Sequence, residues 1–203
     1  MKALGRLVFA SGNPGKLREI RELLAPLGIA VIPQAELGIA EADEPHVTFL
    51  ENALAKARHA SRAAGLPALA DDSGLCVDAL GGAPGVVSAH FAGLHGSREE
   101  RDARNNAKLL AALVPNADRS AHYACVLVLL RAADDPRPVV AEATWHGEIA
   151  DRPRGANGFG YDPLFFVPGR AASAAEFDPA EKNRISHRGI ALARLLERLR
   201  EEV

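Results

Sequence analysis

Two neighbouring carboxylates, Asp71 and Asp72, open the motif Asp71-Asp72-Ser73-Gly74, directly after a short apolar run expected to be a buried strand. Successive side chains of a strand point to opposite faces, so only one of the two can dominate a shared site. Mg²⁺ prefers carboxylate oxygen, with its other positions filled by water and substrate phosphate. A second carboxylate is available in an acidic loop upstream, at Glu41, Asp43 or Glu44. The pattern fits a magnesium site, and it fits a turn cap equally well.

A second segment that could take part in chemistry is Ser11-Gly12-Asn13-Pro14-Gly15-Lys16, which lies where an apolar run gives way to a helical pattern. Backbone amides at a helix N-terminus can bind phosphate oxygens, and Lys16 adds a positive charge. The segment is not a Walker A loop, because Ala10 and Leu17 stand where that motif needs glycine and serine or threonine. A purely structural turn is the alternative reading.

Aromatic side chains lie among glycines in 155–162, where Phe159 and Tyr161 could expose a ring for a base to stack upon. Packing in the core is the alternative for both rings. The glycine-rich 81–85 segment, in contrast, is expected to be a tight structural loop.

Cationic and titratable side chains cluster in 182–188, just before the last expected helix, whose cap would be Ser186. A solvated basic surface is the usual explanation of such a cluster. However, His187 and Arg188 would lie in the first helical turn, where cations are disfavoured unless an anion or acceptor compensates. The position therefore favours a ligand.

Composition limits the class of protein. The 203 residues are 48% apolar and 25% charged, which is ordinary for a single globular domain over residues 1–203. The net charge of -2 favours a small phosphorylated substrate over a nucleic acid polymer or an anionic membrane. Cys76 and Cys125 are expected to be buried thiols in a reducing cytoplasm, and the histidines lack zinc-ligand spacing. No segment predicts a signal peptide or a membrane span.

The elements that must position these groups follow from periodicity. Strands are expected at 7–10, 29–32, 66–70, 75–77, 123–130, 139–149 and 164–167, and helices from Pro14, over 48–64, over 97–113 and over 186–200. Thr48 to Glu51 and Ser97 to Glu100 have capping-box spacing. Strands and helices alternate in the first half and strands pair in the second, which predicts an α/β fold with a mixed sheet flanked by helices.

Taken in order, the motifs resemble the inosine triphosphate pyrophosphatase family, also called Ham1-like or non-canonical purine NTP pyrophosphatases. The matching pieces are SGNPGK at 11–16, TFLENALAKA from Thr48, ADDSGL at 70–75, GGAPG with SAHFAG at 81–93, GFGYDPLF at 158–165 and KNRISHRG at 182–189. Each piece is weak alone, but their order is specific. The resemblance implies a central twisted mixed sheet and two lobes with a nucleotide cleft between them, usually in a homodimer.

The resemblance also implies roles for individual residues. Asp72 would be the catalytic carboxylate, and Glu44 and Asp72 would ligate Mg²⁺. The triphosphate or sugar would be contacted by Ser11, Gly12, Asn13, Pro14, Gly15, Lys16, Lys56 and Ser73. The base pocket would be formed by Phe159, Gly160, Tyr161, Asp162, Lys182, His187 and Arg188.

These roles give a chemically coherent hydrolysis. Lys16, Lys56 and Mg²⁺ would offset the triphosphate charge while a water attacks the α-phosphorus and pyrophosphate leaves. Hypoxanthine and xanthine present an acceptor at O6 where adenine presents a donor, so donors from His187 or Arg188 would select ITP, dITP and XTP. Two alternatives remain open at this stage: a Maf-like pyrophosphatase acting on pyrimidine nucleotides, and a nucleotide-binding module without catalysis.

Overall fold

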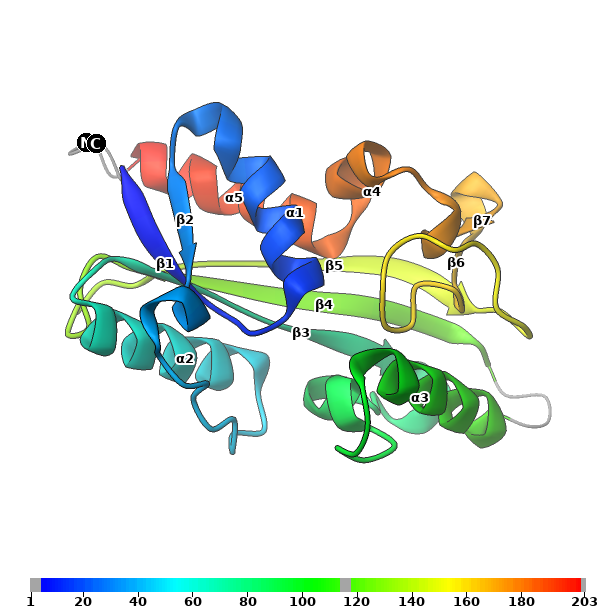
Figure 1. The fold of residues 1–203 in the computed structure, drawn as a ribbon. Helices are drawn as coiled ribbons and strands as arrows, with labels where there is room; N and C mark the ends of the chain where they lie inside the picture. The colour runs from blue at the N-terminus through cyan, green and yellow to red at the C-terminus, as the bar shows by residue number, and fades with distance from the viewer. Residues whose placement is uncertain (1–4, 114–117, 202–203) are drawn as a thin grey trace. The chain divides into compact units, whose positions relative to one another are not determined.

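The computed structural model of the protein describes residues 5–113 and 118–201. Its longer elements are β1 (Arg6–Ala10), α1 (Pro14–Leu24), β2 (Ala30–Pro33), α2 (Phe49–Ala64), β3 (Ala68–Val77), α3 (Arg98–Ala112), β4 (Ser120–Leu130), β5 (Val139–Ile149), β6 (Phe165–Val167), β7 (Ala172–Ser173), α4 (Pro179–Ile185) and α5 (His187–Glu201) (Figure 1).

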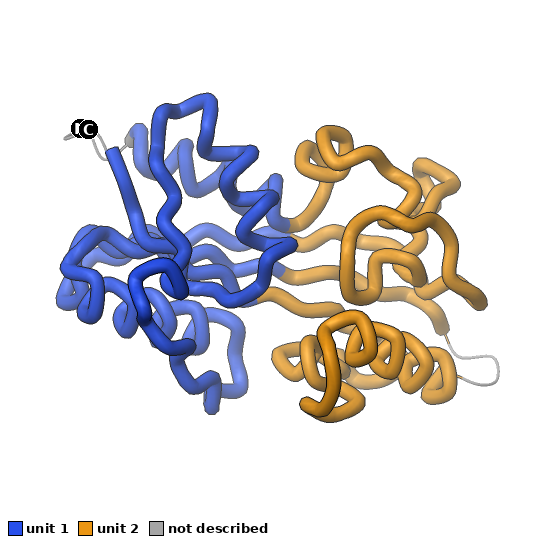
Figure 2. Tube along the Cα trace, viewed as in Figure 1, with its two compact units in different colours: residues 1–72, 125–143, 188–203 blue, residues 73–124, 144–187 orange. Residues whose placement is uncertain are grey.

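A seven-stranded sheet has the strand order β2-β1-β3-β4-β5-β6-β7. β1 pairs in parallel with β2 and β3, whereas β6 pairs antiparallel with β5 and β7. The expected mixed sheet with flanking helices is therefore confirmed. The chain divides into two compact units: unit 1 comprises 1–72, 125–143 and 188–203, and unit 2 comprises 73–124 and 144–187 (Figure 2).

Unit 1 places helices on both faces of its strands, as Figure 1 shows for α1 and α5 on one face and α2 on the other. Leu7 and Phe9 of β1 pack in the cluster that includes Ile20 of α1 and Leu192 of α5. The alternate residues Val8 and Ala10 pack in a second cluster, whose α2 members are Ala53, Ala57 and Ala60. The two-residue period of β1 thus assigns its side chains to two separate cores.

Unit 2 has its own core, built on aromatic rings. Tyr123 of β4 and Trp145 of β5 pack with Phe165 of β6, at centroid distances of 4.6 Å for Tyr123–Phe165 and 5.1 Å for Trp145–Phe165. Leu109 of α3 and Leu75 of β3 belong to the same buried cluster. The apolar positions of α3 therefore anchor this helix on unit 2, which fixes the direction of its polar positions.

Local signals set the helix starts. Ser97 caps α3 in a complete capping box with Glu100, as its spacing predicts. At α2 the Thr48 hydroxyl accepts from the Glu51 amide, but the Glu51 carboxylate bonds to that hydroxyl instead of to the Thr48 amide. This second box is therefore only half formed.

Two expectations need correction. The strands expected at 66–70 and 75–77 are one strand, β3, so the Asp71 to Gly74 motif lies inside a strand and caps no turn. Part of the 182–188 cluster belongs to α4, a helix that the periodicity did not predict. The expected cap of the last helix is borne out by position: Ser186 is extended and lies directly before α5, which begins at His187.

Both cysteines are free, as expected; Cys125 is buried as predicted, whereas Cys76 is only half-buried. In the described part of the chain, none of the helices combines the length and apolar character that crossing a bilayer requires.

Candidate functional site

The 11–16 segment forms the turn between β1 and the N-terminus of α1. Asn13 caps the helix: its Oδ1 accepts from the amides of Gly15 at 2.9 Å and Lys16 at 3.1 Å. Pro14 occupies the first helical turn, where its missing N–H costs nothing. A Cβ at Gly12 would meet the end of the Glu41 side chain, which is exposed and can move aside, so glycine is not strictly required there. The segment is thus a well-capped helix start, and its phosphate-binding role stays a prediction.

Lys16 extends from this helix start to Asp71 of β3, with Nζ 2.6 Å from Oδ1. Asp71 is completely buried and also accepts from Arg188 Nε of α5 at 2.6 Å. Burial raises the pKa of Asp71, but the charges of Arg188 and Lys16 outweigh it and hold that pKa well below its ordinary value. Asp71 is therefore an ionised carboxylate that joins two of the residues predicted to contact substrate.

Arg188 is itself 2% exposed and makes a second buried ion pair, from Nη1 to Glu19 of α1. A guanidinium buried this deeply is tolerated only when carboxylates compensate its desolvation. Its position at the helix start predicts a ligand as the group that compensates this cation. That expectation is wrong for Arg188, because the compensating anions are Asp71 and Glu19 of the protein.

Asp72 points to different partners from those of Asp71, as strand alternation requires. Its Oδ1 accepts from Lys56 Nζ of α2 at 2.8 Å, and the same ammonium donates to Glu44 Oε2 at 2.9 Å. Burial raises the pKa of Asp72 to about 6, although Lys56 and Lys16 oppose the shift. At Glu44, burial also acts upward, but Lys56 prevails and the pKa is lowered. The two carboxylates predicted to bind metal thus share one lysine.

This arrangement fits a hard divalent cation. Asp72 Oδ2 is buried without a hydrogen-bond partner in the described residues, which is costly unless something fills the position. Across 5–113 and 118–201, no three His, Cys, Asp or Glu side chains gather so that they could hold an ion by themselves. Mg²⁺ sites commonly use one or two carboxylates and take the remaining ligands from water and phosphate. A site with Glu44 and Asp72 is consistent with that preference.

The surroundings of Gly74 explain why the motif ends in glycine. A Cβ at this position would collide with the Gly85 carbonyl and lie 2.6 Å from Ser88 Oγ, a hydroxyl that accepts from the Leu75 amide at 2.9 Å. We expect Gly74→Ala to lower the free energy of unfolding by about 1–3 kcal/mol because backbone must move. Urea denaturation measures this effect. Gly169→Ala, where a Cβ meets nothing within 4 Å, is the matched control, and equal stability of the two variants would contradict the prediction.

The 155–162 loop is organised by Asp162, which is 2% exposed. Its Oδ2 accepts from the Phe159 amide at 2.8 Å and from Lys182 Nζ of α4 at 2.6 Å. Lys182 Nζ also lies 4.9 Å from the centroid of the half-buried Phe159 ring. Phe159, Asp162 and Lys182, three of the predicted base-pocket residues, therefore lie together in unit 2.

Tyr161 differs from Phe159. It is 4% exposed, and its hydroxyl donates to the Ser88 carbonyl at 2.9 Å. Burial raises the pKa of this phenol. The Tyr161 ring thus packs in the core of unit 2, as the core alternative predicts.

His187 lies in an aromatic environment within unit 2. Its ring stacks on Tyr123 at a centroid distance of 4.6 Å and an interplanar angle of 11°, and Trp145 lies 6.3 Å away. The imidazole is 4% exposed. Tyr123 and Trp145 were not singled out from the sequence, because each is an ordinary apolar position of a strand until the partner rings are known.

The remaining predicted residues have simple positions. Ser73 is half-buried in β3, Ser11 Oγ accepts from the Asn13 amide at 3.2 Å, and Gly160 lies in the left-handed region. Asp71 and Glu19 were not predicted from the sequence as partners of Lys16 and Arg188. The neighbouring carboxylates Asp71 and Asp72 mark this part of the sequence as a possible site. Glu19 lies 169 positions from Arg188, and no pattern in the sequence indicates that the two residues meet.

Known proteins resemble this chain over nearly its whole length. The model of the Ham1 family matches residues 7–198. A dITP/XTP pyrophosphatase of Ralstonia nicotianae is 64% identical over 195 residues, which cover 96% of each chain. One from Nitrosomonas europaea is 61% identical, with 98% of this chain and 96% of that protein covered.

Solved structures agree with these matches. A HAM1 protein from Coxiella burnetii has a TM-score of 0.87 and 50% identity, covering 97% of this chain and 98% of its own. The Staphylococcus aureus Ham1 protein has a TM-score of 0.84 and 38% identity, with 98% and 100% covered. The similarity therefore extends over nearly the whole fold.

Proposed function

This chain belongs to the Ham1 family, and we propose that it hydrolyses the non-canonical purine nucleotides ITP, dITP and XTP to the nucleoside monophosphate and pyrophosphate. Its similarity over nearly full length to dITP/XTP pyrophosphatases supports this activity. The observation that carries the proposal is the group of Asp72, Glu44 and Lys56, in which two carboxylates share one ammonium and Asp72 Oδ2 lacks a partner in the described residues.

Each charged residue of unit 1 has a distinct task in this proposal. A triphosphate carries about four negative charges, which Lys56 and Lys16 would partly neutralise. Mg²⁺ held by Glu44 and Asp72 would supply further positive charge at the phosphate oxygens. Asp72 would orient the water that attacks the α-phosphorus. Positioning and charge are the main needs of phosphoryl transfer, so no covalent intermediate is required.

Recognition of the base is assigned to Phe159 and to a hydrogen-bond donor from His187 or Arg188. Phe159 would stack on the purine, at a gain of about 1–3 kcal/mol. A donor from His187 or Arg188 would meet the O6 acceptor of hypoxanthine or xanthine, whereas the amino group of adenine would leave that donor unpaired. Because Asp71 and Glu19 already engage Nε and Nη1 of Arg188, any role for this arginine depends on the two carboxylates.

A pyrophosphate-release assay with Mg²⁺ over ITP, dITP, XTP, ATP, GTP, dTTP and UTP tests the proposal. We expect turnover of the first three, with kcat/KM for ITP about 10²-fold or more above that for ATP, since an unpaired buried donor strongly penalises the wrong base. Preference for dTTP or UTP would instead support the Maf-like alternative, against which family membership argues. Tight ITP binding without pyrophosphate release would support the non-catalytic module.

Three further properties extend the proposal. We expect Mg²⁺ to be the divalent cation, the protein to form a homodimer and its substrates to be cytoplasmic nucleotides. The nucleotide cleft expected from the family resemblance stays a prediction, as do the roles assigned to the individual site residues.

A further inference from the structure

Three residues of α3 at four-residue spacing contact the loop that carries Phe159. Positions that are four apart lie along one side of a helix. Asp102 Oδ2 accepts from the Gly160 amide at 2.9 Å, and Asn106 Nδ2 donates to the Gly160 carbonyl at 2.9 Å. One turn before Asp102, the Arg98 guanidinium lies over the Phe159 ring, 5.3 Å from its centroid. α3 therefore holds both backbone polar groups of Gly160 and one neighbouring ring.

Gly160 is a position where such support matters. Its φ of 64° lies in the left-handed region, which glycine adopts freely but which other residues avoid. Glycine loses more conformational freedom on ordering than any other residue, so the loop needs contacts from outside to keep one conformation. The side chains of Asp102 and Asn106 provide two such contacts directly beside Phe159.

Hydrogen bonds hold the backbone at Phe159 itself and at the residue that follows it. Its amide donates to Asp162, the carboxylate that also binds Lys182. The next residue, Gly160, forms hydrogen bonds to α3 through both its amide and its carbonyl. Without the α3 contacts, rotation about the Gly160 backbone would change the direction of the segment that follows the ring.

We propose that Asp102 and Asn106 are positioning residues that hold Phe159 in the orientation needed to stack on the purine, so that α3 determines affinity for the base. This inference rests on the proposed function. Neither side chain touches the reacting phosphorus in this scheme, so the residues act through Phe159 on substrate binding and leave the chemical step unchanged.

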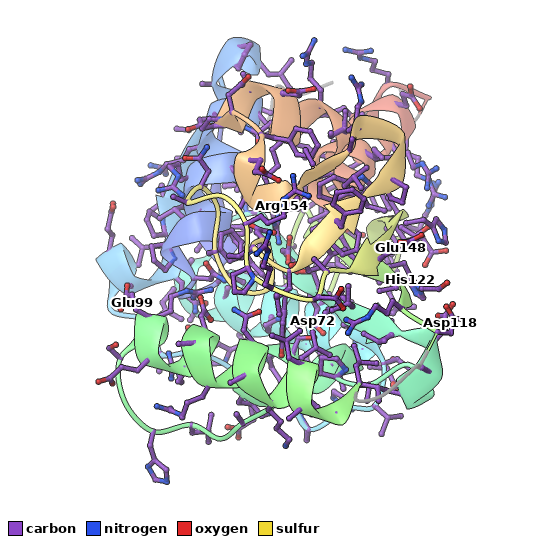
Figure 3. All side chains as sticks on the ribbon, turned by 90° about the vertical axis from the view of Figure 1, so that its right-hand side faces the viewer. Asp72, Glu99, Asp118, His122, Glu148 and Arg154 are labelled. Carbon is purple, nitrogen blue, oxygen red and sulfur yellow. The ribbon has the colours of Figure 1, made fainter. Side chains whose placement is uncertain are left out.

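Steady-state kinetics with ITP test the inference. Asn106→Ala and Asp102→Ala should each raise KM about three- to tenfold, the effect of one lost hydrogen bond, while kcat stays near that of the parent protein. Asp102→Asn keeps an acceptor for the Gly160 amide and should restore a near-normal KM. Glu99→Ala, a charge removal at the start of α3, is the matched control and should change neither constant (Figure 3).

A double-mutant comparison separates positioning from general support of the fold. Phe159→Ala should raise KM, and adding Asn106→Ala in that background should raise it little further, because the ring to be positioned is gone. Melting temperatures of all variants, measured beside the kinetics, report any loss of folded protein. A variant that is only less stable would lower the amount of active enzyme, and hence the apparent kcat, without changing KM.

Two results would overturn the inference: an unchanged KM in both Asp102→Ala and Asn106→Ala, or Asp102→Asn behaving as Asp102→Ala does. If Asn106→Ala yields too little folded protein, the Asp102 pair decides, since its carboxylate is partly exposed on the helix surface. A parent protein that releases no pyrophosphate from ITP would instead refute the proposed function, so the two failures are distinguishable.

Discussion

Asp72→Asn is expected to lower kcat for ITP about 10²- to 10⁴-fold, the range over which a positioned acid–base side chain contributes. The substitution removes the negative charge and the basicity of the carboxylate while keeping its shape. The amide oxygen can still accept from Lys56 Nζ, which Asp72 Oδ1 binds at 2.8 Å. Burial already disfavours a charge at this position, as the raised pKa of about 6 indicates, so the fold should tolerate the neutral side chain.

The acidic loop supplies a matched control for this prediction. Asp43→Asn is the same chemical change one residue before Glu44, on an exposed side chain, and should leave kcat nearly unchanged. Glu44→Gln should cause an intermediate loss that added Mg²⁺ partly restores, because one of the two proposed carboxylate ligands is missing. Circular dichroism verifies that each variant is folded. A near-normal kcat for Asp72→Asn would remove this residue from the catalytic role.

Arg188→Ala is expected to destabilise the protein by about 3–5 kcal/mol, because it leaves two buried carboxylates without their common partner. Asp71 and Glu19 both bind this guanidinium. After the substitution Lys16 would still pair with Asp71, but it does not pair with Glu19. From sequence alone, the main effect expected of this substitution is weaker discrimination between ITP and ATP. The burial of Arg188 makes loss of stability the larger expected effect.

Urea denaturation measures this change, with Arg184→Ala as the control. Arg184 is an exposed arginine of α4, four positions earlier in the chain, and its removal should change the free energy of unfolding by less than about 0.5 kcal/mol. Arg188→Ala combined with Glu19→Gln should be less destabilising than the two single effects added together, since one uncompensated charge is then absent. A loss below about 1 kcal/mol for Arg188→Ala alone, typical of a surface pair, would contradict the buried cluster.

The sequence by itself determined features that depend on near neighbours in the chain. The apolar alternation of β1, the Ser97 cap of α3 and the helical start at Pro14 were predicted correctly because each is set within a few residues. The order of the short motifs also identified the family, since each motif is contiguous. The α4 helix was missed because its seven residues show too little periodicity to reveal a buried face.

Tertiary structure alone decided which charges meet. Arg188 pairs with Asp71, 117 positions away, and with Glu19, 169 positions away, and no local pattern contains that information. It also decided that Phe159 keeps a half-buried ring while Tyr161, two residues later, is buried in the core. The physical reason is that burial and ion pairing depend on what the fold packs against a side chain, whereas helix starts and strand alternation depend on the chain's own backbone hydrogen bonds and side-chain period.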